Sequence, residues 1–148
     1  MDINKIKEIR ESTGLSFGEI KKAVDQSGGD DAKAMEILNA LGASMAEKKS
    51  ARQVKEGLVS AYIHGTGKKG VMVEVLCETD FVARNDDFKT LARDLAMHVI
   101  SMKPATNEEL MEQEFVKDPT LKVRDLINKV IAKTGENIQI GKFVIFEL

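Results

Sequence analysis

The chain has 148 residues, of which 43% are hydrophobic and 31% are charged, with 2 Pro and no Trp. This composition is typical of a folded globular protein, and the length allows one ordinary domain or a small helical module followed by a second compact unit. The formal charge of −2 produces no overall field that would favour nucleic acid or an anionic membrane as a partner.

The first predicted element is a short helix over residues 3–12. Ile3, Ile6 and Ile9 recur at helical spacing with charged residues between them, and Gly14 is a typical helix stop. Such a start is typical of neither a signal peptide nor a transit peptide. Apolar runs elsewhere are far shorter than the roughly 20 residues of a membrane-spanning helix, so we expect a cytoplasmic protein that does not contact a membrane.

Two further short helices are predicted next. Ser16 and Glu19 have the spacing of a capping box at the start of the second helix, which the glycines at 28–29 end. One of the aspartates at 30–31 caps the third helix, and Gly42 is its predicted end. Three short helices in so few residues predict a compact bundle.

The segment that follows, residues 43–56, has the sequence ASMAEKKSARQVKE. Its good helix propensity and few large apolar residues predict an exposed helical connector. The segment also holds a basic cluster, which we define as Lys48, Lys49, Arg52 and Lys55. The cluster is either a solvated helix face or a patch for a phosphate or an acidic partner, although two glutamates within the segment dilute its charge.

From Gly57 the hydrophobic period becomes that of strands. The stretch LVSAYIHG alternates apolar and polar residues, TGKKG is a turn bounded by glycines, and VMVEVLCE is a β-rich run. Together they predict a β-hairpin. The single Cys77 lies in the second strand, where it is either a small buried apolar side chain or a thiol available for an intermolecular disulfide or another reaction.

The remaining residues predict three helices and a final strand. One of residues 85–87 caps the first helix, Thr106 begins the second, and Asp118 with Pro119 begins the third, which Gly135 ends. The final IQIGKFVIFEL is predicted to be a strand.

The predicted fold class is therefore α+β. We expect a three-helix bundle over residues 1–42, a helical connector over 43–56, and a small antiparallel sheet packed with helices over 57–148.

The sequence carries no motif for nucleotide binding, metal binding or nucleophilic catalysis. The stretch GTGKKG lacks the strand-to-helix setting of a phosphate-binding loop. His64 and His98 have no second His, Cys or paired carboxylate at ligand spacing, and no Ser, His and Asp set has a nucleophile signature. We therefore expect no catalytic residue, no metal ion and no cofactor.

The segment CETDFVARNDDF, residues 77–88, places a large aromatic side chain directly after the exit of a strand. Thr79 and Asp80 can hydrogen-bond the local backbone and stiffen the segment, which would present Phe81 to a partner. The alternative is that Phe81 folds back into the core of the protein itself. The residues alone leave both alternatives open.

The same segment carries a family resemblance. VEVLCETDFVARNDDF resembles the signature of bacterial elongation factor Ts, the guanine-nucleotide exchange factor for elongation factor Tu, most densely in ETDFVARN. The N-terminal IKEIRESTGLSFGEIKKAVDQSGGDDAKAMEIL is similar to the opening module of that family, and EGLV, IH and GENI also match in order. The sequence departs at residues 17–20, FGEI, where the family usually has two Met, an Asp and a Cys.

The resemblance implies a function in translation. The chain would bind elongation factor Tu in its GDP-bound and nucleotide-free states and promote GDP release, without covalent chemistry, so that GTP can bind. The exchange segment would insert its aromatic side chain near the magnesium and nucleotide site of the partner. The residues of this exchange segment are Thr79, Asp80, Phe81 and Val82.

The resemblance also assigns roles to the other parts of the chain. The N-terminal module, similar to a ubiquitin-associated fold, would dock elsewhere on the nucleotide domain of the partner, and the core would grip a more distant domain. The residues that we expect to contribute from the N-terminal module are Thr13, Gly14, Lys21 and Lys22.

A homodimer is expected as well. The chain resembles the short members of the family, which have a single core unit and work as homodimers. A single small sheet leaves an edge or a face that a second copy can cover.

Two other classes of function are alternatives. An adaptor or ribosome-linked chaperone would bind peptides through the N-terminal bundle and use residues 57–148 as a scaffold, but the match in ETDFVARN argues against it. A nucleic-acid-binding protein would use the basic cluster and would bind RNA with a steep salt dependence. We expect no direct contact with nucleic acid.

Overall fold

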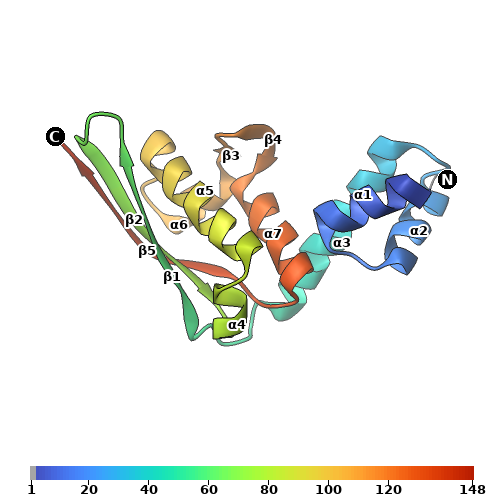
Figure 1. Cartoon of the computed structure of the whole chain (residues 1–148). Helices are drawn as coiled ribbons and strands as arrows, with labels where there is room; N and C mark the ends of the chain where they lie inside the picture. The colour runs from blue at the N-terminus through green and yellow to red at the C-terminus, as the bar shows by residue number, and fades with distance from the viewer. Residues whose placement is uncertain (1–2) are drawn as a thin grey trace.

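The computed structural model describes residues 3–148. The helices are α1 (Ile3–Thr13), α2 (Phe17–Gln26), α3 (Asp31–Lys49), α4 (Asp80–Ala83), α5 (Asp86–Met102), α6 (Asn107–Glu112) and α7 (Val123–Thr134). The strands are β1 (Glu56–His64), β2 (Lys69–Cys77), β3 (Glu114–Phe115), β4 (Asp118–Lys122) and β5 (Gln139–Glu147). The N-terminal helical bundle and the sheet lie at opposite ends of an elongated molecule (Figure 1).

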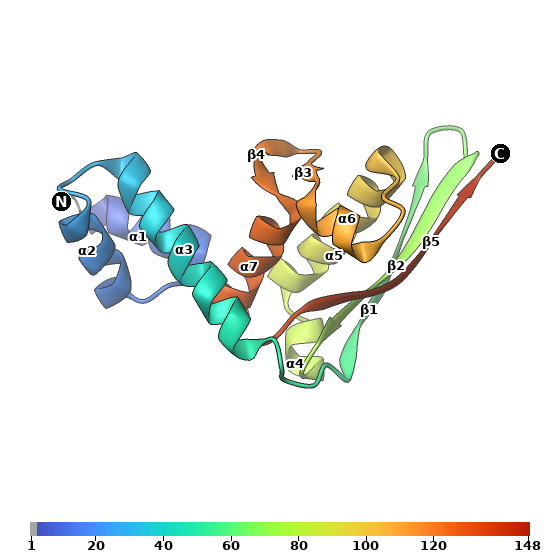
Figure 2. The same cartoon turned by 180° about the vertical axis from the view of Figure 1, so that it is seen from behind.

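The main sheet has the order β1-β2-β5, with both neighbours antiparallel to the central β2. In the β1–β2 hairpin Val59 pairs with Glu74 and Tyr62 pairs with Val71. Helices α5, α6 and α7 all lie on one side of this sheet, and no element of residues 3–148 covers the other side in either view (Figures 1 and 2). The sheet is therefore buried on one face and open on the other.

The alternation of side chains along β2 builds the main core. Val71, Val73 and Val75 are at most 2% exposed and point toward α5, whereas Met72 between them is exposed. Phe88, Leu91 and Leu95 of α5 pack in the same cluster at helical spacing. Alternate side chains of β2 thus pack against side chains at helical spacing on α5, as the two hydrophobic periods in the sequence predict.

A second hydrophobic cluster holds the N-terminal bundle together and joins it to the core. Ile6, Ile20 and Leu38 come from three different helices and are buried together, and Ala132 of α7 packs against them. Gly14 lies at the same junction with a φ of +70°, and a Cβ on it would lie 2.5 Å from the Cα of Lys133. The close approach of the bundle to α7 therefore requires glycine at this position.

Many local predictions are confirmed. The Ser16 hydroxyl accepts the N–H of Glu19 while the Glu19 carboxylate accepts the N–H of Ser16, which completes the capping box. Gly135 ends α7 with a φ of +75°, and the chain ends in a strand. The hairpin also forms, with its turn at residues 65–68, so the last two residues of the predicted turn, Lys69 and Gly70, belong to β2. The α+β class with an N-terminal helical bundle is also confirmed.

The prediction that the third helix ends at Gly42 is wrong. Helix α3 continues to Lys49 and caps itself at Ser50, whereas residues 50–55, predicted as part of a helical connector, are not helical. Gly42 is buried against α7, and the packing of these two helices outweighs the roughly 1 kcal/mol that a glycine costs inside a helix. The division of the chain near residues 42 and 56 remains a prediction.

The prediction that Asp118 and Pro119 begin a helix is also wrong. These residues belong to strand β4, and α7 begins at Val123, where the Asp125 carboxylate accepts the N–H of Lys122. The Asp118 carboxylate instead accepts the N–H and the hydroxyl of Thr120 within β4. An Asp-Pro pair is compatible with the start of a helix and with the first residues of a strand. The pairing of β4 with β3 selects the strand.

Candidate functional site

The segment after β2 forms a one-turn helix, α4. Thr79 has extended backbone angles, φ −128° and ψ 153°, and its hydroxyl oxygen accepts the N–H of Val82 at 3.3 Å. Asn85 then caps α5, with its side-chain oxygen accepting the N–H of Asp87. Because two caps are so close in sequence, only one helical turn fits between them.

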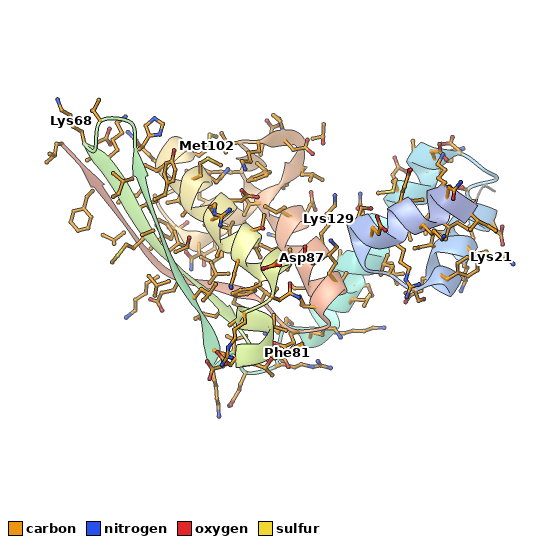
Figure 3. The ribbon with its side chains drawn as sticks, in the orientation of Figure 1. Lys21, Lys68, Phe81, Asp87, Met102 and Lys129 are labelled. Carbon is orange, nitrogen blue, oxygen red and sulfur yellow. The ribbon has the colours of Figure 1, made fainter. Side chains whose placement is uncertain are left out.

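This turn places neighbouring residues on opposite sides. Phe81 is 86% exposed, while Val82 is 5% and Ala83 is 2% exposed and both belong to the main core cluster. The prediction that Phe81 is presented to solvent is confirmed, and the alternative that it packs into its own core is wrong. Val82 anchors the turn from within, which fixes the position of the aromatic ring at this end of the core (Figure 3).

Asp80, beside Phe81, forms an ion pair with Arg84 one turn later. The two side chains are 54% and 77% exposed. Exposed pairs of this kind contribute only about 0–1 kcal/mol. The Asp80 carboxylate can therefore exchange Arg84 for another donor at little cost in free energy, and a shallow hollow lined by these two residues, Phe81 and Asn85 surrounds it.

The start of α4 is held from a distant part of the chain. One carboxylate oxygen of Glu136 accepts the N–H groups of Glu78 and Thr79 at 3.1 and 2.9 Å, and the other accepts the Thr79 hydroxyl at 2.7 Å. In return, the Glu78 carboxylate accepts the N–H of Asn137 at 2.8 Å. The turn between α7 and β5 thus supports the segment that presents Phe81.

Cys77 and His98 are structural. Cys77 is fully buried, as one of its two interpretations predicts, and burial, together with the nearby Glu136 carboxylate, raises the pKa of its thiol to about 11. His98 is also fully buried, with Nε2 bonded to the Gln113 side-chain oxygen and Nδ1 accepting the N–H of Val116. Burial lowers the pKa of His98. Within residues 3–148, no group of side chains is arranged to hold a metal ion.

The lysines expected to act from the N-terminal module lie away from this site. Lys21 and Lys22 are exposed on α2, and Lys21 lies at the outer end of the bundle, whereas Phe81 lies at the lower edge of the core, near the middle of the molecule (Figure 3). Thr13 is buried and donates its hydroxyl to the carbonyl of Ile9, while Gly14 follows it at the junction with α7. The structure therefore does not bring the two predicted sets of residues together.

The basic cluster does not form one helical face. Lys48 and Lys49 end α3, whereas Arg52 and Lys55 lie in the non-helical segment beyond it. Arg52 pairs with Glu78, with 3.6 Å between Nη1 and Oε1, so at least part of this cluster serves the contact between the connector and the core.

Comparison with known proteins assigns the family. Residues 78–148 match the sequence profile described as Elongation factor TS. The chain is 39% identical to the elongation factor Ts of Thermotoga petrophila, with 100% of this chain and 96% of that protein aligned. It is 40% identical to the elongation factor Ts of Carboxydothermus hydrogenoformans, over 97% and 87% of the two chains. The chain belongs to the elongation factor Ts family.

The match to these elongation factor Ts relatives includes a length difference. The alignment with the Thermotoga petrophila protein extends over 191 positions, whereas this chain has 148 residues, so more than forty aligned positions have no counterpart here. The elongation factor Ts of Thermodesulfovibrio yellowstonii, 36% identical over 97% of this chain, likewise aligns over 187 positions.

In the part of the chain that the structure describes, no helix is long and apolar enough to cross a membrane.

Sequence reasoning did not assign a role to Glu78, Glu136 or Asn137. GENI at residues 135–138 served only as a matching motif, although it contains two of these residues. The proximity of GENI to the exchange segment depends on the pairing of β2 with β5, which places Leu76 beside Gln139. If β2 and β5 are predicted to pair, GENI lies next to the exit of β2. That pairing is the signal from which the contact of Glu136 with Glu78 could have been found.

Proposed function

We propose that this chain is a guanine-nucleotide exchange factor for elongation factor Tu. It binds the GDP-bound GTPase, places Asp80 and Phe81 near the magnesium and nucleotide site, and so promotes GDP release and GTP entry. The observation that supports this most strongly is the exposure of Phe81 on a helical turn whose other side is anchored in the core. The process needs no covalent step and no cofactor, and it takes place in the cytoplasm without membrane or nucleic acid.

The magnitude of the contribution from Phe81 can be bounded. Burial of a phenylalanine side chain yields about 1.5–3 kcal/mol, and a tenfold change in rate requires about 1.4 kcal/mol. Phe81 alone therefore supplies about one to two powers of ten in the release rate. Any larger acceleration draws on binding by the rest of the chain, which makes insertion of the aromatic ring an intramolecular event.

The direction of exchange follows from linkage. If the exchange factor weakens GDP binding by a given factor, GDP weakens the binding of the exchange factor by the same factor. The complex with the nucleotide-free partner is therefore the tightest, and entry of GTP displaces the exchange factor.

The N-terminal module provides a second contact on the same partner domain. The exposed Lys21 and Lys22 of α2 supply positive charge there, while Thr13 and Gly14 shape the junction with α7 that sets the direction of the bundle. Since Lys21 lies at the outer end of the bundle, well away from Phe81, both contacts can form at once only on a large partner (Figure 3).

We also propose that two copies pair through the open face of the main sheet. Five large apolar residues on this face are 41–68% exposed, and they come from all three strands: Val59, Ile63, Met72, Val144 and Phe146. The same face carries Glu74 and Lys142, which line a hollow with Val59, Met72 and Val144. A face with both charge signs around an apolar centre can be complementary to itself, as a twofold interface requires.

The exchange proposal is tested by stopped-flow release of labelled GDP from elongation factor Tu. We expect Phe81→Ala to lower the maximal release rate about 10- to 100-fold while the half-saturating concentration changes less. Val116→Ala, at an exposed apolar position between β3 and β4, serves as a control and should match the unchanged chain. Equal maximal rates for Phe81→Ala and the unchanged chain would contradict the proposal.

A further inference from the structure

We infer that Glu136 is a positioning residue for nucleotide exchange, because it holds α4 in the conformation that presents Phe81. This inference rests on the proposed function and adds a residue to it. Glu136 lies between α7 and β5, 57 residues along the chain from Thr79, and its carboxylate does not need to reach the partner.

The hydrogen bonds of Glu136 act on the cap of α4. The Thr79 hydroxyl donates its single hydrogen to the Glu136 carboxylate, with 2.7 Å between the oxygens. The lone pairs of the hydroxyl oxygen are then free to accept the N–H of Val82 at 3.3 Å. The same carboxylate binds the N–H groups of Glu78 and Thr79. One side chain thus fixes both the backbone before α4 and the orientation of its capping hydroxyl.

Helix α4 depends on such support because it has only four residues. A single helical turn is unstable in isolation, since the cost of ordering the backbone exceeds the gain from one or two hydrogen bonds. Val82 and Ala83 hold the inner side of the turn, and the Glu136 carboxylate holds its N-terminal end. Without Glu136 we expect the N-terminal end of α4 to fray while the sheet and α5, which form most of the main core, stay folded.

The contact is reciprocal, and it extends to the connector. Glu78 accepts the N–H of Asn137, and Asn137, only 2% exposed, donates its side-chain amide to the carbonyl of Arg52 at 2.8 Å. Arg52 in turn pairs with Glu78. We name these three residues, together with Glu136 and Thr79, the exchange-segment bracket. It joins the connector, the exit of β2 and the start of β5.

The test compares Glu136→Ala and the milder Glu136→Gln with the unchanged chain. The first readout is hydrogen exchange in the free protein, without any partner. We expect the amides of Glu78, Thr79 and Val82 to exchange faster in both variants, while the amides of α5 keep their protection. Glu112→Ala is the matched control, because Glu112 is a glutamate that binds only the side chains of Lys122 and Arg124.

The second readout is GDP release from elongation factor Tu. We expect Glu136→Ala to lower the maximal rate about tenfold, the effect of losing charge-assisted hydrogen bonds, with a smaller change in the half-saturating concentration. The double variant Phe81→Ala with Glu136→Ala should be no slower than Phe81→Ala alone, since Glu136 acts through Phe81. Thr79→Val, which removes the capping hydroxyl, should lower the rate in the same direction as Glu136→Ala.

The outcomes separate the inference from the proposed function. Unchanged amide exchange in Glu136→Ala would overturn the bracket, and additive effects in the double variant would overturn the positioning role and indicate a general loss of stability. Unchanged release by Glu136→Ala when Phe81→Ala is slow would overturn the inference and leave the proposed function standing. Unchanged release by Phe81→Ala would overturn the proposed function and the positioning role with it.

Discussion

Phe81 and Val82 are adjacent in sequence, yet one is almost fully exposed and the other is buried. A strand would separate them in the same way, but a strand would also continue the sheet and leave the aromatic side chain beside β1 or β5. The single turn of α4 instead directs Phe81 to solvent while Val82 stays in the core. At the scale of residues, the exposure of Phe81 therefore depends on one capping hydroxyl and one buried anchor.

Glycines at two positions should respond in opposite ways to substitution. Gly42 is helical, and a Cβ there would meet no atom within 4 Å, beside a cavity of about 20 Å³. We expect Gly42→Ala to stabilise the protein by about 0.5–1 kcal/mol. Gly14→Ala should destabilise it by roughly 2 kcal/mol or more, since Gly14 has a positive φ and lies against the Lys133 backbone. Urea denaturation of both variants measures the difference, and equal effects would contradict the assigned geometry.

His98 should make stability depend on pH. Its pKa is lowered in the folded state by burial, so on acidification the unfolded chain takes up a proton first. The free energy of unfolding should therefore be highest, as far as His98 determines it, above a pH of about 6.5. Below that pH it should fall by at most about 1.4 kcal/mol per pH unit. Denaturation at pH 7.5 and 5.5 measures this fall, and His98→Gln should reduce it. An identical fall in the variant would assign the effect to other groups.

At the scale of elements, the connector after α3 is held by side chains rather than by its own secondary structure. Residues 50–55 are neither helix nor strand, and the buried Asn137 donates to the carbonyls of Ser50 and Arg52. The continuous helix α3 then transmits this attachment to the N-terminal bundle, which also packs on α7. Two contacts thus set the direction of the bundle relative to the exchange segment: the hydrogen bonds of Asn137 to the connector, and the packing of the bundle on α7.

Removal of the Asn137 side chain should loosen the connector. We expect Asn137→Ala to lower the free energy of unfolding by about 1–3 kcal/mol, because two carbonyls lose a buried donor. Trypsin should then cleave faster after Arg52 or Lys55. Gln139→Ala is the control, since its exposed side chain makes one long hydrogen bond, 3.4 Å, to Ser50. Equal cleavage of the two variants would argue that Asn137 does not hold this segment.

At the scale of the whole molecule, two hydrophobic clusters and one open sheet face decide how the chain can bind. The clusters meet at α7, whose residues contribute to both. The site at α4 and the lysines of α2 lie at separate places on this framework, and the open sheet face lies at a third (Figures 1 and 3). Each of the three can therefore be occupied without blocking the others.

The proposed dimer should be sensitive to charge on the open sheet face. Phe146 is 68% exposed at the end of β5, and we expect Phe146→Asp to produce a monomer at micromolar concentration. Val116→Asp, at an exposed apolar position outside this sheet, should leave the dimer intact. Sedimentation of the free proteins distinguishes the two. A monomeric unchanged chain at the same concentration would refute the proposed pairing.

Sequence by itself determined the features that depend on residues close together in the chain. Caps such as Ser16 with Glu19, the stop at Gly135 and the alternation along β2 need only neighbours within about four residues, and the motif around Phe81 indicates the family. Tertiary structure decided the rest. Helix α3 passes Gly42 because it packs on α7, Asp118 joins a strand because β3 pairs with it, and Phe81 points outward because Val82 and Glu136 hold the turn. These contacts outweigh local preferences of about 1 kcal/mol, and some join residues 58 positions apart, as Glu78 and Glu136 are.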